Sequence, residues 1–199
     1  MKICFVRHAE IKRYVGELIP DAVGISWKGK RTAKKVAEYL NNENVTIVYS
    51  SPIIRASETA EIIAKAFNVD HITMKQFTER KGVVPRTPLE QEWADNYLNL
   101  DYRNGKVETI SDFYKANYEG LDLIIKENKL KETKEKEQTI IIVAHSSNLY
   151  AFNAYFNKLP LKGKAVLTQW QKVKYLKPIT PIIQKKKNTN MVFLQLKLN

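Results

Sequence analysis

The run Thr139–Ala144 (TIIIVA) constrains the fold of this chain more than any other feature of its sequence. Its residues are apolar almost without interruption, which is typical of a strand buried on both faces of a parallel sheet. Ile3–Val6 has the same character, and Val45–Tyr49 is predicted as a further strand. We therefore predict an α/β fold, a three-layer sandwich in which helices cover both faces of a mostly parallel central sheet.

Helices are predicted between these strands from the spacing of apolar residues. Ser26 is expected to cap the first helix at its N-terminus. Ser51 is expected to cap a second helix, with Pro52 in its first turn, where a proline removes no hydrogen bond. The first helix, Trp27–Leu40, carries apolar residues at positions i, i+3, i+4 and i+7, namely Ala33, Val36, Ala37 and Leu40.

Further predicted elements are a short strand at Ile72–Met74, a helix capped by Ser111 and a helix over Asn148–Phe156. The region 80–110 is irregular, with prolines and aromatic residues, and we expect it to form a lid or an insert over a site. Neither an internal repeat nor an interdomain linker is recognisable, so residues 1–199 are expected to form a single domain.

The composition narrows the classes of protein to which this chain can belong. A hydrophobic share of 44% fits a globular domain, and no apolar run approaches the roughly 18–20 residues that span a bilayer, so no membrane partner is expected. The first residues do not resemble a secretory signal, and we expect a cytoplasmic location. The single cysteine, Cys4, excludes an internal disulfide and a cysteine-based zinc site, and no metal site is predicted.

The formal net charge of +12 raises the alternative of nucleic-acid binding. The excess of lysine is scattered along the chain, and its densest run, Lys185–Lys187, is typical of a solvated loop. No RNA-binding aromatic signature, helix-turn-helix pattern or zinc-finger spacing accompanies the charge. We therefore expect no specific nucleic-acid partner, and the charge indicates an affinity for anions in general.

Polar residues follow three of the predicted strands at the point where each strand ends. Arg7-His8 follows the first strand, Ser50–Arg55 follows the second, and His145 follows TIIIVA. Ligands of parallel sheets bind beyond the carboxyl ends of the strands, so the topology is expected to bring these residues together. Each of them taken singly fits an ordinary surface or core position. Two histidines and two arginines at one edge of a sheet favour a phosphate site.

The residue types at this edge suit phosphoryl transfer. Arginine offers paired N–H donors that match phosphate oxygens, and a helix N-terminus after Ser51 would add backbone donors. A neutral imidazole with a free nitrogen can attack phosphorus, and a second histidine can donate a hydrogen bond or a positive charge to the phosphoryl oxygens. Such a site has no requirement for magnesium, and we expect no cofactor.

These motifs resemble those of the histidine phosphatase superfamily, also called the phosphoglycerate mutase-like family. Arg7-His8-Ala9-Glu10 resembles the family's Arg-His-Gly-Glu motif, and His145-Ser146 stands where the family usually has His-Gly. The resemblance spans about Met1 to Asn157 and implies the phosphoglycerate mutase-like fold. Further positions similar to the family's pattern are Ser26, Gly29, Ala33, Ser51-Pro52, Arg55 and Thr59-Ala60.

The resemblance also implies roles for the residues at the strand ends. His8 would be the nucleophile that becomes phosphohistidine. Arg7, Arg55 and His145 would hold the transferred phosphoryl group, and His145 would also take part in catalysis.

The family uses an acidic residue after the third strand as general acid, and Glu79 stands at about the expected place. Glu90 and Glu92, both in the irregular region, are the alternatives. A structural interpretation also stays open for Glu79, as a surface carboxylate paired with Arg80 or Lys81.

The activity that the resemblance implies is hydrolysis of phosphate monoesters through a phosphohistidine intermediate. Ala9 and Ser146 replace two glycines of the family pattern, and Tyr14 stands where its mutases and many of its phosphatases carry asparagine. The sugar-phosphate pattern of the mutases is also absent, which favours a phosphatase. The alternatives are a phosphoglycerate mutase-type phosphotransferase and a catalytically weakened, anion-binding member of the same fold.

We expect the substrate to be a small phosphorylated molecule, with a phosphoprotein as the alternative. Two alternating stretches, 165–176 and 191–198, predict edge strands through which a homodimer could form. Four basic residues in and near the irregular region suggest a substrate with more than one anionic group, namely Arg80, Lys81, Arg86 and Arg103.

The segment Gly24–Lys30 reads G-x-x-x-x-G-K, which is close to the phosphate-binding loop of nucleotide-binding proteins. Arg31 follows where serine or threonine would hold magnesium, and no clear strand ends at Val23. We therefore do not expect a nucleotide-binding protein.

Overall fold

The computed structural model describes residues 1–80, 87–95, 102, 108–130, 137–158 and 193–197. No helix among these residues is long and apolar enough to cross a membrane. In chain order the elements are β1 (Lys2–Arg7), α1 (Trp27–Tyr39), β2 (Val45–Ser50), α2 (Ile54–Phe67), β3 (His71–Thr73), the short 3₁₀ helix η1 (Lys75–Phe77), α3 (Pro88–Asp95), α4 (Ile110–Lys129), β4 (Thr139–Ala144), α5 (Ser146–Phe156) and β5 (Phe193–Lys197).

Five strands form one sheet in the order β3-β2-β4-β1-β5. Strands β3, β2, β4 and β1 are parallel to their neighbours, whereas β5 pairs with β1 in the antiparallel direction at the edge. The predicted mostly parallel sheet is therefore confirmed. The edge strand predicted at 191–198 is confirmed as β5, while the one predicted at 165–176 lies outside the described residues.

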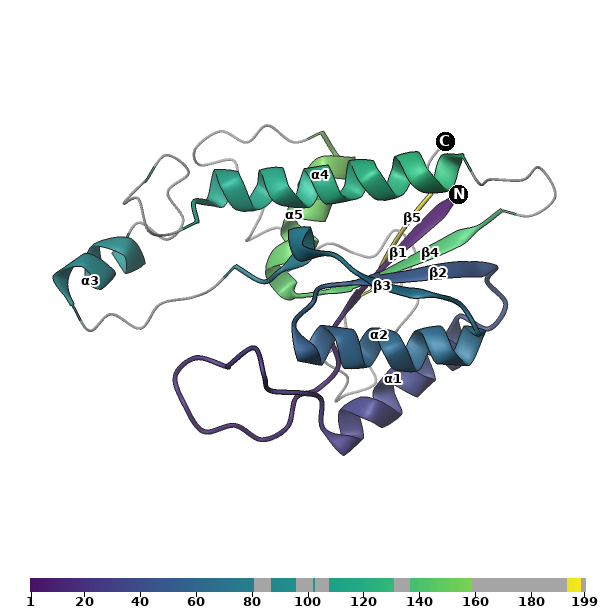
Figure 1. The fold of residues 1–199 in the computed structure, drawn as a ribbon, viewed down its shortest axis with the longest axis horizontal. Coiled ribbons are helices and arrows are strands. Elements are labelled where there is room, and N and C mark those ends of the chain that lie inside the picture. Colours follow the sequence, from purple (N-terminus) through teal and green to yellow (C-terminus); the bar gives the residue numbers. More distant parts are fainter. Residues whose placement is uncertain (81–86, 96–101, 103–107, 131–136, 159–192, 198–199) are drawn as a thin grey trace.

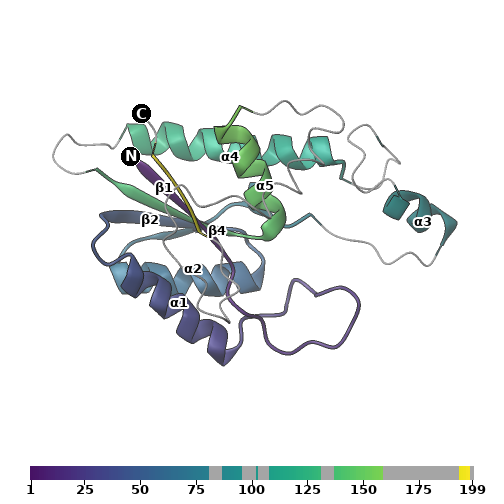
Figure 2. The same cartoon turned by 180° about the vertical axis from the view of Figure 1, so that it is seen from behind.

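Helices cover both faces of the sheet, with α1 and α2 on one side and α4 and α5 on the other (Figure 1; Figure 2 shows the same arrangement from behind). Successive residues of a strand point to opposite faces. Cys4 and Val6 belong to the core cluster that includes residues of α1 and α2, whereas Ile3 and Phe5 belong to the one that includes residues of α4 and α5. Because both faces are covered, TIIIVA needs no polar alternation, and the predicted three-layer sandwich is confirmed.

The predicted caps of the first and fourth helices have different outcomes. Ser26 is the N-cap of α1, as predicted, and its hydroxyl accepts the Gly29 N–H at 2.9 Å. The prediction for Ser111 is wrong, because α4 begins at Ile110 and its N-cap is Thr109, two residues before Ser111. The Thr109 hydroxyl accepts the Asp112 N–H at 3.0 Å, which satisfies one of the free donors of the first turn.

The prediction that Ser51 caps α2 is also wrong. The helix begins at Ile54, its N-cap is Ile53, and Pro52 lies before the first turn. Ser51 Oγ instead lies 2.9 Å from Nε2 of His145, at the end of the neighbouring strand β4. The Ser51 hydroxyl, which local sequence patterns assign to the N-cap of α2, therefore contacts a residue that is distant in the sequence.

The region 80–110, predicted to be irregular, contains the helix α3 and the start of α4. Figure 1 shows α3 standing away from the sheet, on the side where the parallel strands end. Most of the rest of this region lies outside the described residues. The lid and the single-domain organisation stay predictions.

Gly29 is required where α1 packs against the chain that follows β1. A Cβ atom added to Gly29 would lie 2.2 Å from the carbonyl oxygen of Glu10, which also accepts the Ser26 N–H at 2.7 Å. We predict that Gly29→Ala lowers the free energy of unfolding by more than about 2 kcal/mol, because backbone atoms must move apart. Urea unfolding followed by circular dichroism measures this change.

Gly16→Ala is the matched control for this prediction. The atoms nearest to a Cβ added at Gly16 belong to the ring of Tyr14, an exposed side chain that can rotate away. We expect Gly16→Ala to be nearly neutral. Equal losses of stability in the two variants would contradict the steric explanation.

Candidate active site

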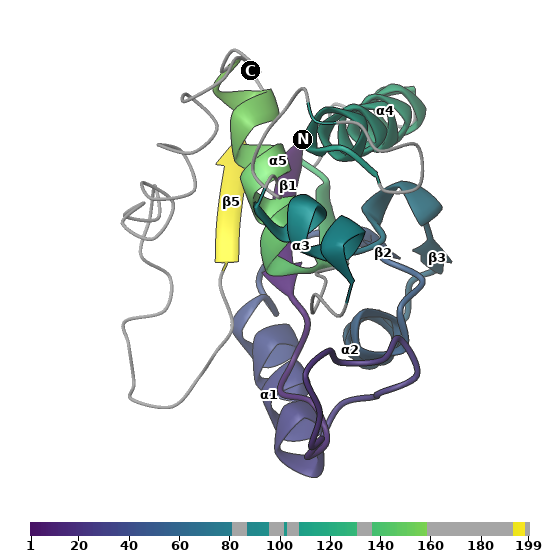
Figure 3. The same ribbon diagram turned by 90° about the vertical axis from the view of Figure 1, so that its left-hand side faces the viewer.

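The ends of β1, β4 and β2 lie side by side because these strands are neighbours in the sheet. Arg7 at the end of β1 is level with Ala144 at the end of β4, and the His8 N–H still donates to the Ala144 carbonyl at 2.9 Å. The ring centroids of His8 and His145 are 5.2 Å apart. Figure 3 looks onto this edge of the sheet, with α2 and α5 beginning there. The predicted convergence of the two histidines is thus present in the structure.

His8 has one ring nitrogen, Nε2, with no hydrogen-bond partner among the residues that the structure describes. Its Nδ1 lies 2.9 Å from the carbonyl oxygen of Ala9, so this nitrogen carries the proton and donates. The pKa of His8 is lowered to about 4, mainly by burial; the bond to Ala9 opposes this shift, and the positive charges of Arg7 and Arg55 add to it. The imidazole is therefore neutral at pH 7, and the lone pair of Nε2 is available to attack an electrophile.

His145 is fully buried and contacts two polar groups on opposite sides of its ring. Nε2 lies 2.9 Å from Ser51 Oγ, within hydrogen-bond distance. Nδ1 lies 3.3 Å from a carboxylate oxygen of Glu79 but has no hydrogen-bond partner among the described residues. Burial is the main cause that lowers the pKa of His145 to about 2, followed by the charges of His8, Arg55 and Arg7. In the unliganded protein this side chain is a neutral group that can donate only one hydrogen bond.

Two arginines lie beside the histidines with their positive charges partly uncompensated. Nε of Arg7 is buried and has no hydrogen-bond partner among the described residues. Arg55, in the first turn of α2, is 3% exposed; it donates to the Pro20 carbonyl at 3.3 Å and to the carboxylate of Glu79. A buried charged donor without a partner is costly, so Arg7 indicates a place for an anion.

Glu79 reaches the same cluster from the segment after β3 and η1. One of its oxygens contacts both the Arg55 guanidinium and Nδ1 of His145. Arg55 donates to this oxygen, whereas Nδ1 of His145 lies beside it without forming a hydrogen bond. A phosphoryl oxygen in the same place would be within reach of both groups. Glu90 and Glu92, the alternative acids, lie in α3, which stands away from the ends of β1 and β4 (Figure 1).

Asn148, which the sequence did not single out for the site, connects its parts. Its Oδ1 accepts the backbone N–H of His145 at 3.1 Å, and its Nδ2 donates to the Thr78 carbonyl at 3.5 Å and to Asn117 Oδ1 at 2.9 Å. Asn148 is fully buried. It therefore fixes His145 relative to the residue before Glu79. The signal in the sequence was an amide three residues after the histidine, at the start of a helix, where such side chains cap.

The sequence also matches a known family over most of its length. Residues 3–173 match the profile of the histidine phosphatase superfamily (branch 1). The chain belongs to the histidine phosphatase superfamily. The family predicted from the motifs is therefore confirmed.

Individual histidine phosphatases and a mutase are similar to this chain. Phosphoserine phosphatase 1 of Hydrogenobacter thermophilus is 29% identical over 158 residues, which cover 73% of this chain and 71% of the relative. The 2,3-bisphosphoglycerate-dependent phosphoglycerate mutase of Thermoplasma acidophilum is 29% identical over 160 residues, covering 78% and 76%. The structure of mycobacterial glucosyl-3-phosphoglycerate phosphatase has a TM-score of 0.64 at 17% identity, covers 83% of each chain, and shows the shared fold.

Ala9 and Ser146, which stand where the family pattern has glycine, cause no backbone strain. Among the described non-glycine residues, a positive φ occurs at Asn68 and Lys158, so neither Ala9 nor Ser146 needs the conformations that favour glycine. Ala9 is buried, and its N–H donates to the Thr59 hydroxyl at 3.0 Å. This bond ties the first motif to the helix α2 that carries Arg55.

Tyr14 lies in the long loop between β1 and α1, which is closed by a bridge between Ile11 and Ile25. Its side chain is 40% exposed, and its ring lies over Gly16. This loop instead contributes a backbone group to the site, because the Pro20 carbonyl accepts from Arg55. The position that carries asparagine in many histidine phosphatases therefore supplies no amide here.

The structure also explains why Gly24–Lys30 differs from a phosphate-binding loop. The segment enters α1 through Ser26, whose hydroxyl donates to the Glu10 carboxylate at 3.1 Å. Lys28 forms an ion pair with the same carboxylate at 3.1 Å. A carboxylate at the start of a helix takes the place of an anionic ligand. The expectation that this is not a nucleotide site stays a prediction.

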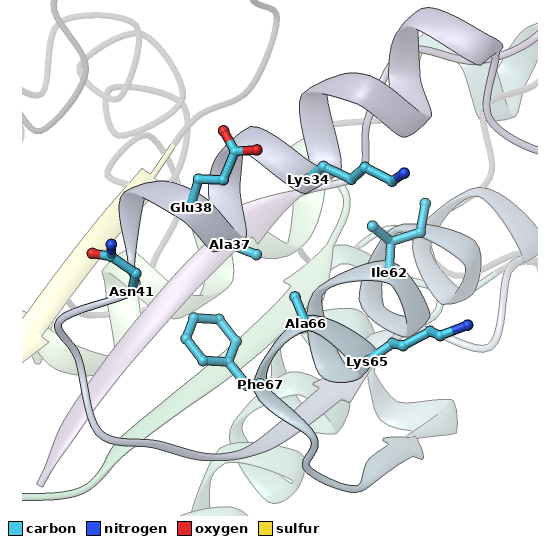
Figure 4. Close-up of a pocket in the computed structure, with 8 residues that line it drawn as sticks. All are labelled: Lys34, Ala37, Glu38, Asn41, Ile62, Lys65, Ala66 and Phe67. Carbon is cyan, nitrogen blue, oxygen red and sulfur yellow. The ribbon is translucent and has the colours of Figure 1, made fainter.

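A groove of about 660 Å³ lies between α1 and α2 (Figure 4). Lys65 and Phe67, which line it, belong to the last turn of α2, whereas Arg55 belongs to the first. Nothing among the described residues indicates what occupies the groove, and we assign no ligand to it.

Proposed function

We propose that this chain is a phosphatase that hydrolyses phosphate monoesters through a phosphohistidine at Nε2 of His8. The observation that carries the proposal is the neutral Nε2 of His8 in one cluster with the buried Nε of Arg7, neither of which has a hydrogen-bond partner among the described residues. A nucleophile and anion-binding donors in one place are what attack on a phosphate ester needs.

In the first step, the phosphoryl group binds to Arg7, Arg55 and His145. One of its oxygens replaces the Glu79 oxygen between the Arg55 guanidinium and Nδ1 of His145, and this frees the carboxyl group. Nε2 of His8 then forms a bond to phosphorus while the bond from phosphorus to the leaving oxygen breaks. The freed Glu79 carboxylate takes the proton of the monoanionic phosphate ester and then gives it to that oxygen, so the alcohol leaves as a neutral molecule.

In the second step, Glu79 is a carboxylate and takes a proton from a water molecule. The oxygen of that water attacks phosphorus, the bond to Nε2 of His8 breaks, and inorganic phosphate leaves. His8 is again neutral, with its Nδ1 proton held on the Ala9 carbonyl throughout. No step in this sequence uses a metal ion.

For the substrate we propose a small phosphate monoester with a second anionic group. Phosphoserine and phosphoglycerate, which appear in the names of the relatives, both carry a carboxylate close to the phosphate. Of the basic residues that suggested this from the sequence, Arg80 is buried and donates to the Glu108 carbonyl at 3.4 Å, so it supports the start of α4. Lys81, Arg86 and Arg103 lie outside the described residues.

A substrate panel tests this function. We predict release of phosphate from p-nitrophenyl phosphate, and a kcat/KM at least about 10-fold higher for phosphoserine or 3-phosphoglycerate than for glycerol 2-phosphate. Phosphate release from each ester is measured with a colorimetric assay. Absence of phosphate release from every ester would contradict the proposed phosphatase activity. A higher kcat/KM for glycerol 2-phosphate, which has no second anionic group, would contradict the proposed substrate class.

A phosphoglycerate mutase-type phosphotransferase is the second candidate, since one of the relatives is a mutase. A mutase keeps its phosphohistidine until a second alcohol accepts the group, whereas a phosphatase gives it to water. Interconversion of 2- and 3-phosphoglycerate faster than release of phosphate would favour the mutase. A phosphoprotein substrate and a homodimer stay predictions.

A further inference from the structure

Ser51 lies directly behind His145 and contacts the ring nitrogen that faces away from Glu79. It is fully buried, and its N–H donates to the Val143 carbonyl of β4 at 3.0 Å, which fixes its backbone beside the end of that strand. Its Oγ lies 2.9 Å from Nε2 of His145. The same Oγ accepts the N–H of Ile53 at 3.3 Å.

A serine hydroxyl has one proton to donate, and its geometry here selects the acceptor. Among the described residues, the acceptor recorded next to Ser51 Oγ is Nε2 of His145. If Nε2 carried a proton instead, Oγ would accept two N–H groups and its own proton would be buried without an acceptor. In addition, Nδ1 is buried 3.3 Å from the Glu79 oxygen and has no hydrogen-bond partner among the described residues, so a bare Nδ1 would place two acceptors side by side.

We propose that Ser51 is a positioning residue that holds His145 as the Nδ1–H tautomer. In this state Ser51 donates to Nε2, and the single proton of the neutral ring points from Nδ1 into the site. His145 then offers a hydrogen-bond donor to the phosphoryl oxygen that replaces the Glu79 oxygen, without carrying a positive charge. The catalytic use of this donor rests on the proposed function, whereas the tautomer itself does not.

The other two histidines provide internal references. His8 donates through Nδ1 to the Ala9 carbonyl, so it is also an Nδ1–H tautomer. Nε2 of His71 lies 2.8 Å from Ser50 Oγ, which itself donates to the Ser51 carbonyl at 2.9 Å. His71 must therefore donate through Nε2. The protein should contain two neutral histidines protonated at Nδ1 and one protonated at Nε2.

Nitrogen-15 NMR of the ring nitrogens in the free, histidine-labelled protein tests the assignment directly. A neutral ring shows one N–H nitrogen and one bare nitrogen, and proton couplings identify which is which. His71→Gln and His145→Gln identify the signals of two rings, and His8 is the third. We expect His145 to be protonated at Nδ1 in the wild type at pH 7. Protonation of His145 at Nε2 in the wild-type protein would by itself overturn the proposal.

Ser51→Ala then tests the cause, with Ser50→Ala as the matched control. Both substitutions remove one buried hydroxyl from adjacent residues, but only the one at 51 faces His145. We expect the Nε2–H form of His145 to appear in Ser51→Ala and the His145 signals to stay unchanged in Ser50→Ala. An unchanged His145 in Ser51→Ala, or an equal change in both, would overturn the role of Ser51.

Kinetics test the catalytic use. Removing one donor to a transition-state oxygen costs about 10²–10³-fold in kcat. Ser51→Ala keeps His145 and only lowers the share of molecules in which Nδ1 can donate, so we expect its kcat to fall by about 10–100-fold. The loss should appear in kcat with little change in KM, and Ser50→Ala should retain nearly wild-type kcat. A wild type without phosphatase activity that still shows the expected tautomers would overturn the proposed function and support the tautomer assignment.

Discussion

Replacing His8 by alanine should reduce hydrolysis of p-nitrophenyl phosphate by at least about 10⁴-fold, because the substitution removes the atom that bonds to phosphorus. Arg7 and Arg55 are unchanged and would still bind phosphate, so the affinity of the variant for inorganic phosphate should stay within about 10-fold of the wild-type value. Initial rates over a range of substrate concentrations measure the first effect, and isothermal titration with phosphate measures the second.

The third histidine provides the matched control for His8→Ala. His71 lies at the start of β3, and its Nε2 lies 2.8 Å from Ser50 Oγ. His71→Gln should retain most of the activity. Rapid quenching after mixing with a phosphorus-32-labelled substrate should trap an acid-labile phosphoenzyme in His71→Gln and in the wild type, but not in His8→Ala. A label retained by His8→Ala would place the nucleophile elsewhere.

The convergence of His8 and His145 could be predicted from the sequence because it follows from topology. Thr139–Ala144 and Ile3–Val6 are apolar enough to identify buried parallel strands, and such strands place their carboxyl ends at one edge. The hydrogen bond from the His8 N–H to the Ala144 carbonyl shows that the pairing of β1 with β4 continues up to the first histidine. Each histidine directly follows one of these two strands, so identifying the strands was sufficient to place both histidines at the same edge.

The neighbours of these histidines could not be predicted in the same way. Ser51 has the local features of a helix cap, with proline after it, and its use by His145 depends on a contact between β2 and β4. Thr109 and Ser111 are both good caps by residue type and stand two residues apart, so local preference alone does not choose between them. Local preferences are weaker than such tertiary contacts.

The departures from the family pattern turned out to differ in weight once the backbone was known. The sequence could not show whether Ala9 stands at a position that needs glycine. The structure places it in an ordinary conformation, bonded to Thr59, so this change gives no reason to expect a weakened site. Tyr14 is a real difference, because an exposed ring replaces an amide, and Arg55 is supported by the Pro20 carbonyl and Glu79.

Glu79→Gln should separate leaving groups that need a proton from those that do not. For phosphoserine we expect kcat to fall by about 10²–10³-fold, since general acid catalysis contributes on this scale. For p-nitrophenyl phosphate, whose leaving group is stable as an anion, we expect less than about a 10-fold loss in the step that forms phosphohistidine. Single-turnover measurements of p-nitrophenol release isolate that step from the later attack by water.

The same variant should bind phosphate at least as tightly as the wild type, because a neutral amide replaces the carboxylate that competes for Arg55 and His145. Glu92→Gln is the matched control, since it makes the same chemical change in an exposed residue of α3. Glu79 would lose the role of general acid if Glu92→Gln, or the corresponding change at Glu90, gave the selective loss with phosphoserine. It would lose it equally if both esters slowed to the same extent in Glu79→Gln, because a carboxyl group that only arranges the arginines cannot distinguish one leaving group from another.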